Sequence, residues 1–304
     1  MPDRRRIASN QSRTFGRKIW RVKMEDENRV RNMVRDRYSS AISTGSSCCG
    51  SGGPERQFIP ADRVACSAGY TEEQLQVLPP DAVANSFGCG NPLALSGVLP
   101  GQTVVDIGSG AGIDCFLAAR IVGPSGRVIG LDMTPAMIEK ARANAQTGGF
   151  NHVEFRLGEA EQMPLKDGEA DWIISNCVIN LSPNKPAVFN EAFRVLKSGG
   201  QISISDIMVE SLPQILRENK TLYTSCVAGA IPEKEYMQGL EQAGFVDVRV
   251  VDRIVYDREQ VLHLIQENEA VTHLEELTGE SLNSLVDKYV VNNIWSSRIV
   301  ARKL

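Results

Sequence analysis

Apolar and polar positions alternate in a regular way between residues 103 and 207. Short runs rich in Val, Ile and Leu are separated by longer segments in which apolar residues recur at helical spacing. Strands that alternate with helices indicate an α/β fold, here a doubly wound, mostly parallel seven-stranded sheet with helices on both faces. The predicted elements are strands at 103–107, 127–132, 153–157, 170–176 and 201–207, with helices near 112–122, 135–147 and 185–196.

The segments on either side of this pattern predict attachments to the sheet. An amphipathic helix near 28–41 would form an N-terminal cap over the ligand pocket, and the long segment at 208–231 is a candidate lid. We expect three parts: a basic, disordered extension at 1–27, a main domain at 28–254 and a C-terminal accessory region at 255–304. The later predicted elements are a helix at 232–243, a strand at 246–253, a helix near 281–291 and a strand-like segment at 297–301.

Composition narrows the class of protein. Hydrophobic residues make up 42% of the 304 residues, yet no apolar run is long enough to cross a bilayer and no secretory segment is present. The seven cysteines are an odd number without a repeated spacing, which disfavours a disulfide framework and favours a reducing compartment. We therefore expect a monomeric, cytoplasmic protein that does not bind membranes and whose thiols are available for chemistry.

Charge is unevenly distributed along the chain. Residues 1–23 hold eight Lys and Arg and one acid, which gives +7, and the net charge of −4 leaves −11 on the rest. An acidic body disfavours binding to nucleic acid. We interpret the first 23 residues as a disordered tail, or as residues that precede a natural translation start at Met24, with an RNA-binding arm and a targeting segment as alternatives.

A glycine cluster follows the first predicted strand. Residues 104–112 read as a buried strand, a tight turn and a helix start, because glycine permits positive φ and close approach of a ligand to the backbone. The N–H groups at the start of the helix favour a carboxylate or a phosphate. The dinucleotide pattern G-x-G-x-x-G is incomplete, since Ile113 occupies its last position, and here an acid, Asp106, precedes the glycines.

This order, D-x-G-x-G-x-G, resembles the first motif of class I S-adenosylmethionine methyltransferases, whose fold is Rossmann-like. The resemblance implies that Asp106 helps to hold the ammonium group of the cofactor, while Asp132, at the end of the next strand, stands where related sites place a ribose-binding carboxylate. Glu159 and Ala160 match the family's contact with adenine. The predicted cofactor-binding residues are Asp106, Gly108, Ser109, Gly110, Gly112, Asp132, Met133, Glu159, Ala160 and Asn176.

A thiol stands at the edge of the sheet where open α/β folds bind ligands. Cys177 directly follows the strand at 170–176, within Asn-Cys-Val-Ile-Asn-Leu, and Cys89 lies within Phe-Gly-Cys-Gly. Together with the Asp-Cys pair that ends at Cys115, these motifs resemble arsenite methyltransferases over about residues 28 to 255. The resemblance implies that Cys89, Cys177 and Cys226 bind trivalent arsenic.

The family also has a cysteine in its N-terminal loop. Cys48 and Cys49 both compete for that position, in a stretch rich in Gly and Ser, so we include both among the catalytic residues. No role in the family falls to Cys66 or Cys115, and Cys115 reads as a small buried residue of a helix.

The chemistry of arsenic fits such thiols independently of the resemblance. Trivalent arsenic is soft and prefers thiolates, and three of them leave its lone pair directed at the sulfonium methyl. Each thiol proton can leave with an arsenite hydroxide as water, so positioning and exclusion of solvent replace a general base. We expect mono- and dimethylated products from arsenite and methylarsenite. Re-reduction would use Cys48 and Cys49 together with Cys89, with thioredoxin or glutathione as the thiol reductant.

Other functions remain open from the sequence. A class I methyltransferase acting on a quinone or another small molecule would keep Asp106 and Asp132 but would be indifferent to Cys177. A non-catalytic protein that sequesters arsenicals or metals would bind arsenite without consuming the cofactor. A zinc site is disfavoured, because C-x-x-C is absent and the histidines, His152, His263 and His273, show no ligand spacing.

Overall fold

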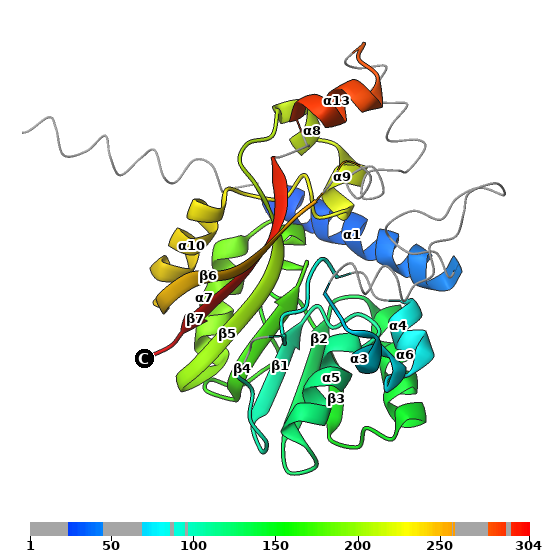
Figure 1. Ribbon diagram of the computed structural model, residues 1–304, viewed down its shortest axis with the longest axis vertical. Helices are drawn as coiled ribbons and strands as arrows, with labels where there is room; N and C mark the ends of the chain where they lie inside the picture. The colour runs from blue at the N-terminus through cyan, green and yellow to red at the C-terminus, as the bar shows by residue number, and fades with distance from the viewer. Residues whose placement is uncertain are drawn as a thin grey trace, which may run out of the picture.

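The computed structural model describes residues 24–44, 69–85, 88–94, 97–256, 258, 279–289 and 293–304. Its strands are β1 (Thr103–Ile107), β2 (Arg127–Asp132), β3 (Val153–Leu157), β4 (Ala170–Asn176), β5 (Leu196–Val209), β6 (Val246–Val255) and β7 (Ile294–Arg302). They form one sheet in the order β3-β2-β1-β4-β5-β7-β6 (Figure 1). The first five strands in this order, from β3 to β5, are parallel to one another, whereas β7 is antiparallel to both β5 and β6. The expected mostly parallel, seven-stranded sheet is confirmed.

Helices cover both faces of the sheet, because a strand sends alternate side chains to opposite sides. Val104 of β1 packs in a cluster with α5 (Ile113–Val122) and α6 (Pro135–Gly148). Its neighbour Val105 packs on the other face, with α7 (Lys185–Val195) and α10 (Glu233–Gln242). The sheet is therefore buried on both sides, as its near-continuous apolar strands require.

The remaining elements gather mainly around the end of the sheet where the parallel strands finish (Figure 1). Val34 of α1 (Met24–Thr44) packs in one cluster with Leu216 of α8 (Gln214–Arg217) and Leu222 of α9 (Lys220–Thr224). The predicted cap and the predicted lid segment thus meet over the same edge. The other short elements are α3 (Glu72–Gln76), α4 (Pro80–Ala84), the 3-10 helix η1 (Ile179–Leu181) and α13 (Leu282–Tyr289).

Two predicted boundaries were wrong for identifiable reasons. The expected strand at 201–207 begins at Leu196, because the N–H of Gly199 donates to Lys303 O at 2.9 Å and the N–H of Lys303 donates to Gly200 O at 2.9 Å. Gly199 and Gly200, which were expected to end the preceding helix, therefore belong to β5 and pair with the C-terminal segment. The cap helix begins at Met24, so residues 24–27 belong to a helix and not to a disordered extension.

The C-terminal strand is an integral part of the sheet. The strand-like segment expected at 297–301 forms β7, which lies between β5 and β6. The division of the chain into a main domain and an accessory region at 255–304 stays a prediction. This division would cut through the sheet, because β7 belongs to residues 255–304 and joins β6 to β5. Residues 1–23 and 259–278, including the histidines at 263 and 273, lie outside the described residues.

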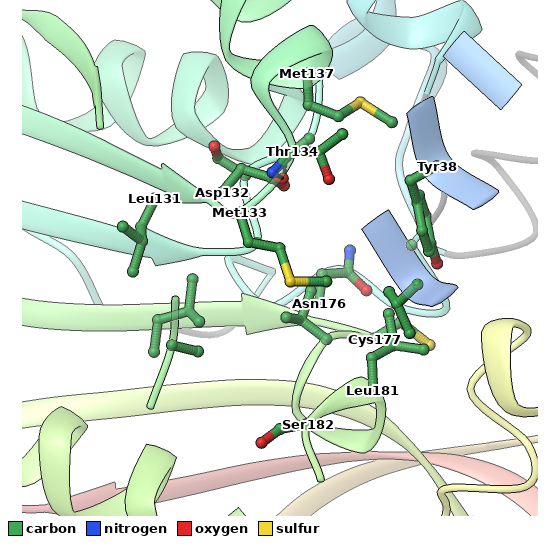
Figure 2. A pocket seen from close by; sticks show the side chains of 18 of the residues that line it. Tyr38, Leu131, Asp132, Met133, Thr134, Met137, Asn176, Cys177, Leu181 and Ser182 are labelled. Carbon is green, nitrogen blue, oxygen red and sulfur yellow. Dashed lines mark hydrogen bonds between the residues drawn. The ribbon is translucent and has the colours of Figure 1, made fainter. Parts of the chain in front are cut away.

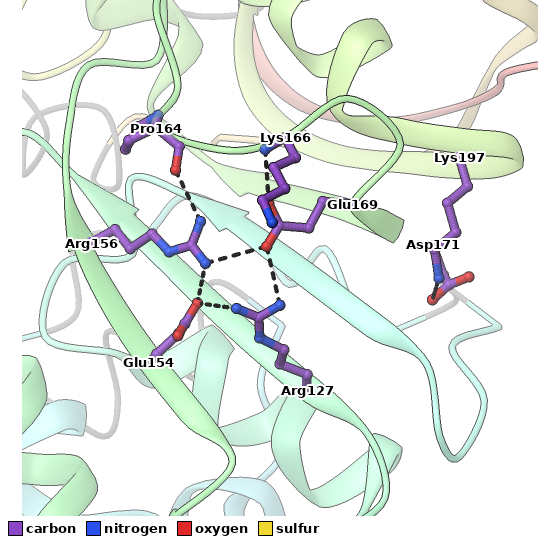
Figure 3. A network of polar contacts seen from close by, with 8 residues as sticks. All are labelled: Arg127, Glu154, Arg156, Pro164, Lys166, Glu169, Asp171 and Lys197. Carbon is purple, nitrogen blue, oxygen red and sulfur yellow. Dashed lines mark hydrogen bonds and ion pairs between the residues drawn. The ribbon is translucent and has the colours of Figure 1, made fainter.

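An ion-pair network joins β2, β3 and the turn before β4 (Figure 3). The Arg127 guanidinium contacts Glu154 at 2.7 Å and Glu169 at 3.1 Å, and Arg156 contacts the same two carboxylates. Burial alone would raise the pKa of Glu169, but the N–H of Lys166 and the Arg156 guanidinium lower it below its ordinary value. Among the described helices, none combines the length and the apolar character that a membrane crossing needs.

Candidate cofactor pocket and thiol site

A pocket opens beyond the carboxyl ends of β1, β2 and β4, where the strand order of the sheet reverses. Figure 2 shows Tyr38 of α1 on one side of it and Asp132 and Met133 on the other. Seven of the ten predicted cofactor residues line the pocket: Gly108, Ser109, Gly110, Asp132, Met133, Ala160 and Asn176. Lining residues that sequence reasoning missed include Arg31, Val34, Tyr38, Asp114, Thr134, Met137, Glu161, Leu181 and Ser182.

The glycine turn folds as its sequence predicts. Gly108 has φ +75°, and its N–H donates to Leu131 O at 2.7 Å, which holds the turn against β2. A side chain at this position would overlap Val178, and one at Gly112, where φ is +102°, would overlap Phe116. Gly112 therefore serves helix packing and does not line the pocket.

Asp132, the last residue of β2, lines the pocket next to the glycine turn. The carboxylate of Asp132 accepts the N–H of Gly110 at 3.0 Å and the N–H of Thr134 at 2.8 Å. Burial raises the pKa of Asp132, while these N–H groups oppose the shift. Asp132 thus connects the glycine turn to the start of α6 and retains acceptor capacity for a ligand.

Asp106 lies behind the turn and does not line the pocket. It is 2% exposed, and its carboxylate accepts a weak hydrogen bond from the Cys115 thiol at 3.3 Å. The acid that lines the pocket near the turn is Asp114, in the first turn of α5, and burial raises its pKa to about 6 against the opposing bonds from Asn176 and Tyr70. The role expected of Asp106 stays a prediction, and Asp114 is a second candidate for it.

Glu159 contacts arginines of the cap helix. Its carboxylate pairs with Arg31 at 3.5 Å and with Arg35 at 3.5 Å, and Glu159 does not line the pocket. Arg31 also pairs with Glu161 at 3.6 Å, and both of these residues do line the pocket. The adenine contact predicted for Glu159 therefore stays a prediction, with Glu161 as its neighbour on the pocket wall.

Of the three predicted arsenic-binding cysteines, Cys89 and Cys177 lie in contact next to this pocket, and Cys226 packs in the same apolar cluster. Cys89 and Cys177 form a disulfide with a Cα–Cα distance of 5.7 Å. The Cys226 thiol donates to the backbone oxygen of Cys177 at 2.8 Å, and Cys177 itself lines the pocket. Because Cys89 and Cys177 are separated by 88 positions, sequence spacing does not reveal that the fold brings them together.

The backbone is unusual at two of these cysteines. Cys177 has φ +60° and Cys226 has φ +64°, and the third described residue other than glycine with a positive φ is Asp247. Such conformations cost about 1–3 kcal/mol each and occur preferentially at functional sites. All three cysteines are buried, with exposed fractions of 8% for Cys89, 5% for Cys177 and 4% for Cys226. The cluster therefore combines buried thiols with an unfavourable backbone conformation at Cys177 and Cys226.

The other cysteines divide into two groups. Cys48, Cys49 and Cys66 lie outside the described residues, so the roles predicted for Cys48 and Cys49 stay predictions. Burial and the nearby Asp106 raise the pKa of the Cys115 thiol, which keeps it protonated. This environment agrees with the interpretation of Cys115 as a small buried residue.

A buried charge pair lies behind the thiols and escaped sequence reasoning. One carboxylate oxygen of Asp206 and the sulfurs of Cys89 and Cys177 all lie within 4.8 Å of one another. Burial raises the pKa of Asp206 to about 7 and lowers the pKa of Lys185 to about 8, and each charge opposes the shift of the other. Asp206 follows Ser-Ile-Ser inside a strand, a context that gives no local sign of a site.

Comparisons with known proteins identify the class of protein. A model of the methyltransferase domain matches residues 99–244. A putative methyltransferase from Bacillus halodurans, 23% identical, shares the fold with a TM-score of 0.54 over 70% of this chain and 96% of that one. The family model and the fold together identify a methyltransferase domain.

The family follows from more similar proteins. The crystal structure of an arsenic(III) S-adenosylmethionine methyltransferase from Chlamydomonas reinhardtii is 32% identical, with a TM-score of 0.57 over 82% of this chain and 75% of that chain. The arsenite methyltransferase of Halobacterium salinarum is 41% identical over 239 residues, which are 75% of this chain and 60% of the relative. The chain belongs to the arsenite methyltransferase family. It spans about three fifths of the length of the arsenite methyltransferases of Halobacterium salinarum and Aquipseudomonas alcaligenes.

Proposed function

We propose that this protein transfers methyl groups from S-adenosylmethionine to trivalent arsenic held by Cys89, Cys177 and Cys226. The observation that supports the proposal is that Cys89 and Cys177, from separate segments, lie in contact beside the pocket, with the Cys226 thiol 2.8 Å from the backbone oxygen of Cys177. Family membership supports the same activity, since the relatives named above are arsenite methyltransferases.

The residues of the pocket fit the proposed cofactor. The glycine turn leaves room for the amino acid end of the molecule, and Asp114 faces this part of the pocket as a candidate for its ammonium group. Asp132, fixed by two backbone N–H groups, presents its remaining acceptor capacity to the ribose hydroxyls. When bound, S-adenosylmethionine supplies an electrophilic methyl group at its sulfonium.

The thiol cluster fits trivalent arsenic in its reduced state. Sulfur ligands suit a soft element, and the cysteines, all less than 9% exposed, would surround it with little water. Each thiol proton can leave with an arsenite hydroxide as water, so binding needs no separate base. The apolar side chains of the same cluster, such as Leu181 and Val227, keep the site closed to solvent.

The disulfide between Cys89 and Cys177 requires a reductant before arsenic can bind. Two reductant thiols, from thioredoxin or glutathione, would give up two electrons and become a disulfide, while their protons pass to the two released sulfurs. Cys48 and Cys49 are the candidates for relaying this exchange. Since each methyl transfer oxidises arsenic to the pentavalent state, closure of a protein disulfide would return the two electrons needed for the next round.

The direct test incubates the protein with arsenite, S-adenosylmethionine and a thiol reductant, and then separates the arsenic species. We expect methylarsenicals from the native protein and none from Cys177→Ser, with Cys115→Ser retaining activity as the matched buried-cysteine control. If S-adenosylhomocysteine forms at the same rate in Cys177→Ser with another acceptor, the substrate is not arsenic. If arsenite binds but no S-adenosylhomocysteine forms, the protein sequesters arsenic and the proposal is wrong.

A further inference from the structure

The side chain of Asn176 holds the loop that carries Cys89. Its Oδ1 accepts the N–H of Cys89 at 3.0 Å and the N–H of Gly90 at 3.2 Å. Its Nδ2 donates to the backbone oxygen of Gly90 at 2.6 Å. Only a carboxamide offers an acceptor and a donor in this arrangement, so these partners also fix which end of the amide carries the oxygen.

The glycines on either side of Cys89 permit this contact. A Cβ on Gly88 would overlap the Asn176 amide, and a Cβ on Gly90 would lie 2.6 Å from Cβ of Ser205 in β5. Real Cβ atoms do not approach other heavy atoms so closely, so a side chain at either position would push the loop away from the sheet. The Phe-Gly-Cys-Gly motif is therefore the form of loop that can bring a thiol against the end of β4.

Two further side chains orient the amide of Asn176. Its Nδ2 also lies 2.8 Å from the hydroxyl of Tyr70 and 3.1 Å from Oδ2 of Asp114. The Tyr70 hydroxyl in turn donates to Oδ1 of Asp114 at 2.8 Å. All three residues are buried, with exposed fractions of 3%, 4% and 9% for Tyr70, Asp114 and Asn176. Hydrogen bonds among buried groups are costly to break, which makes this a rigid support.

We infer that Asn176 is a positioning residue that sets the thiol of Cys89 beside that of Cys177, with Tyr70 and Asp114 orienting its amide. This inference rests on the proposed function, because it assigns Asn176 a task in assembling the arsenic site. Asn176 immediately precedes Cys177, so its backbone places one sulfur and its side chain places the other. Sequence reasoning assigned Asn176 to the cofactor alone.

The same support connects the two sites. Asp114 and Asn176 line the cofactor pocket, whereas Tyr70 does not, and Cys89 belongs to the thiol cluster. Removing the Tyr70 hydroxyl therefore loosens the support without changing a lining residue of the pocket. Tyr70→Phe keeps the volume of the ring, which makes it the cleanest variant for this purpose.

The test measures how closely Cys89 and Cys177 are held together. The reduced full-length protein is equilibrated with mixtures of reduced and oxidised glutathione, and mass spectrometry of the Cys89–Cys177 peptide pair gives the equilibrium constant of the disulfide. We expect Tyr70→Phe to lower this constant by about three- to tenfold, as loss of one buried hydrogen bond implies, and Asn176→Asp to lower it further. In Tyr70→Phe, KM for arsenite should rise more than KM for S-adenosylmethionine.

Ser203→Ala is the matched control, because it removes another buried bond to the same loop, from Ser203 Oγ to Pro92 O at 2.7 Å, without touching Cys89. An equal fall in Ser203→Ala and Tyr70→Phe would mean that any loosening of the loop suffices and would overturn the positioning role. An unchanged disulfide constant in both Asn176→Asp and Tyr70→Phe would overturn it as well. The disulfide measurement uses neither arsenic nor cofactor, so failure of the proposed function shows separately, as an absence of methylarsenicals from the native protein.

Discussion

The cofactor pocket and the thiol site share one edge of the sheet but are built in different ways. The pocket is made chiefly by two consecutive strand-to-helix turns, and the N–H of Gly110 in the first turn donates to the Asp132 carboxylate in the second, 22 positions later. The thiol site draws Cys89, Cys177 and Cys226 from segments that only the completed fold brings together.

The pocket is the part that other methyltransferases share, whereas the thiol site is particular to this family. The glycine turn and the acid that follows the next strand are features shared with many methyltransferases, and they define a cofactor without defining a substrate. The cysteines lie on the flanking loops, and the sheet serves as their rigid support. The two regions should therefore respond to substitution independently, except at Asn176 and Asp114, which contribute to both.

The largest effect is expected from Cys226→Ser, which breaks the thiol site alone. Its thiol donates to the backbone oxygen of Cys177 at 2.8 Å, and the variant removes the sulfur that we propose as the third ligand. Oxygen is a poor ligand for soft arsenic, and we expect the rate of arsenite methylation to fall by roughly 100-fold or more. Arsenic speciation measures the loss, and unchanged S-adenosylhomocysteine affinity in a titration checks that the pocket survives. Full activity would show that Cys226 is not a ligand.

A smaller effect is expected from Asp132→Asn, which breaks the pocket alone. In the variant one of the two carboxylate oxygens becomes an NH2 group, which cannot accept the N–H of Gly110 or of Thr134. Losing a charged acceptor costs about 1.5–3 kcal/mol, so we expect S-adenosylhomocysteine to bind about 10- to 100-fold more weakly, as measured by calorimetry. The Cys89–Cys177 disulfide constant should not change. A parallel loss in that constant would contradict the independence of the two regions.

The smallest effect is expected from Glu169→Gln. Glu169 belongs to the ion-pair network of Figure 3 and lines neither the pocket nor the thiol site. Its pKa is lowered in the folded protein, so its charge stabilises the fold above the unfolded pKa of about 4.3, and this stabilisation is lost as the pH falls. We expect the variant to lose about 1 kcal/mol of unfolding free energy at pH 7 and less at pH 3, by urea titration. Arsenite methylation should be unaffected, and a change in it would mean that the sheet transmits distant strain to the sites.

The sequence predicted the pocket better than the thiol site for physical reasons. Alternation of apolar runs and helices follows from local burial, so the strands from 103 to 176 begin and end where expected, and the glycine turn lines the pocket. Asp114 was missed because a single acid in the first turn of a helix also suits the helix dipole. Asp206 was missed because its neighbours form a buried strand, and the Cys89–Cys177 pairing depends on contacts across 88 positions.

The most direct test of three sulfurs around one arsenic atom is X-ray absorption spectroscopy at the arsenic edge. The reduced native protein is measured with one equivalent of arsenite, alongside Cys226→Ser and Cys115→Ser. We expect three arsenic–sulfur contacts in the native protein and in Cys115→Ser, and two with one oxygen in Cys226→Ser. Oxygen-dominated coordination in the native protein, or an unchanged sulfur count in Cys226→Ser, would contradict a site built from these three cysteines.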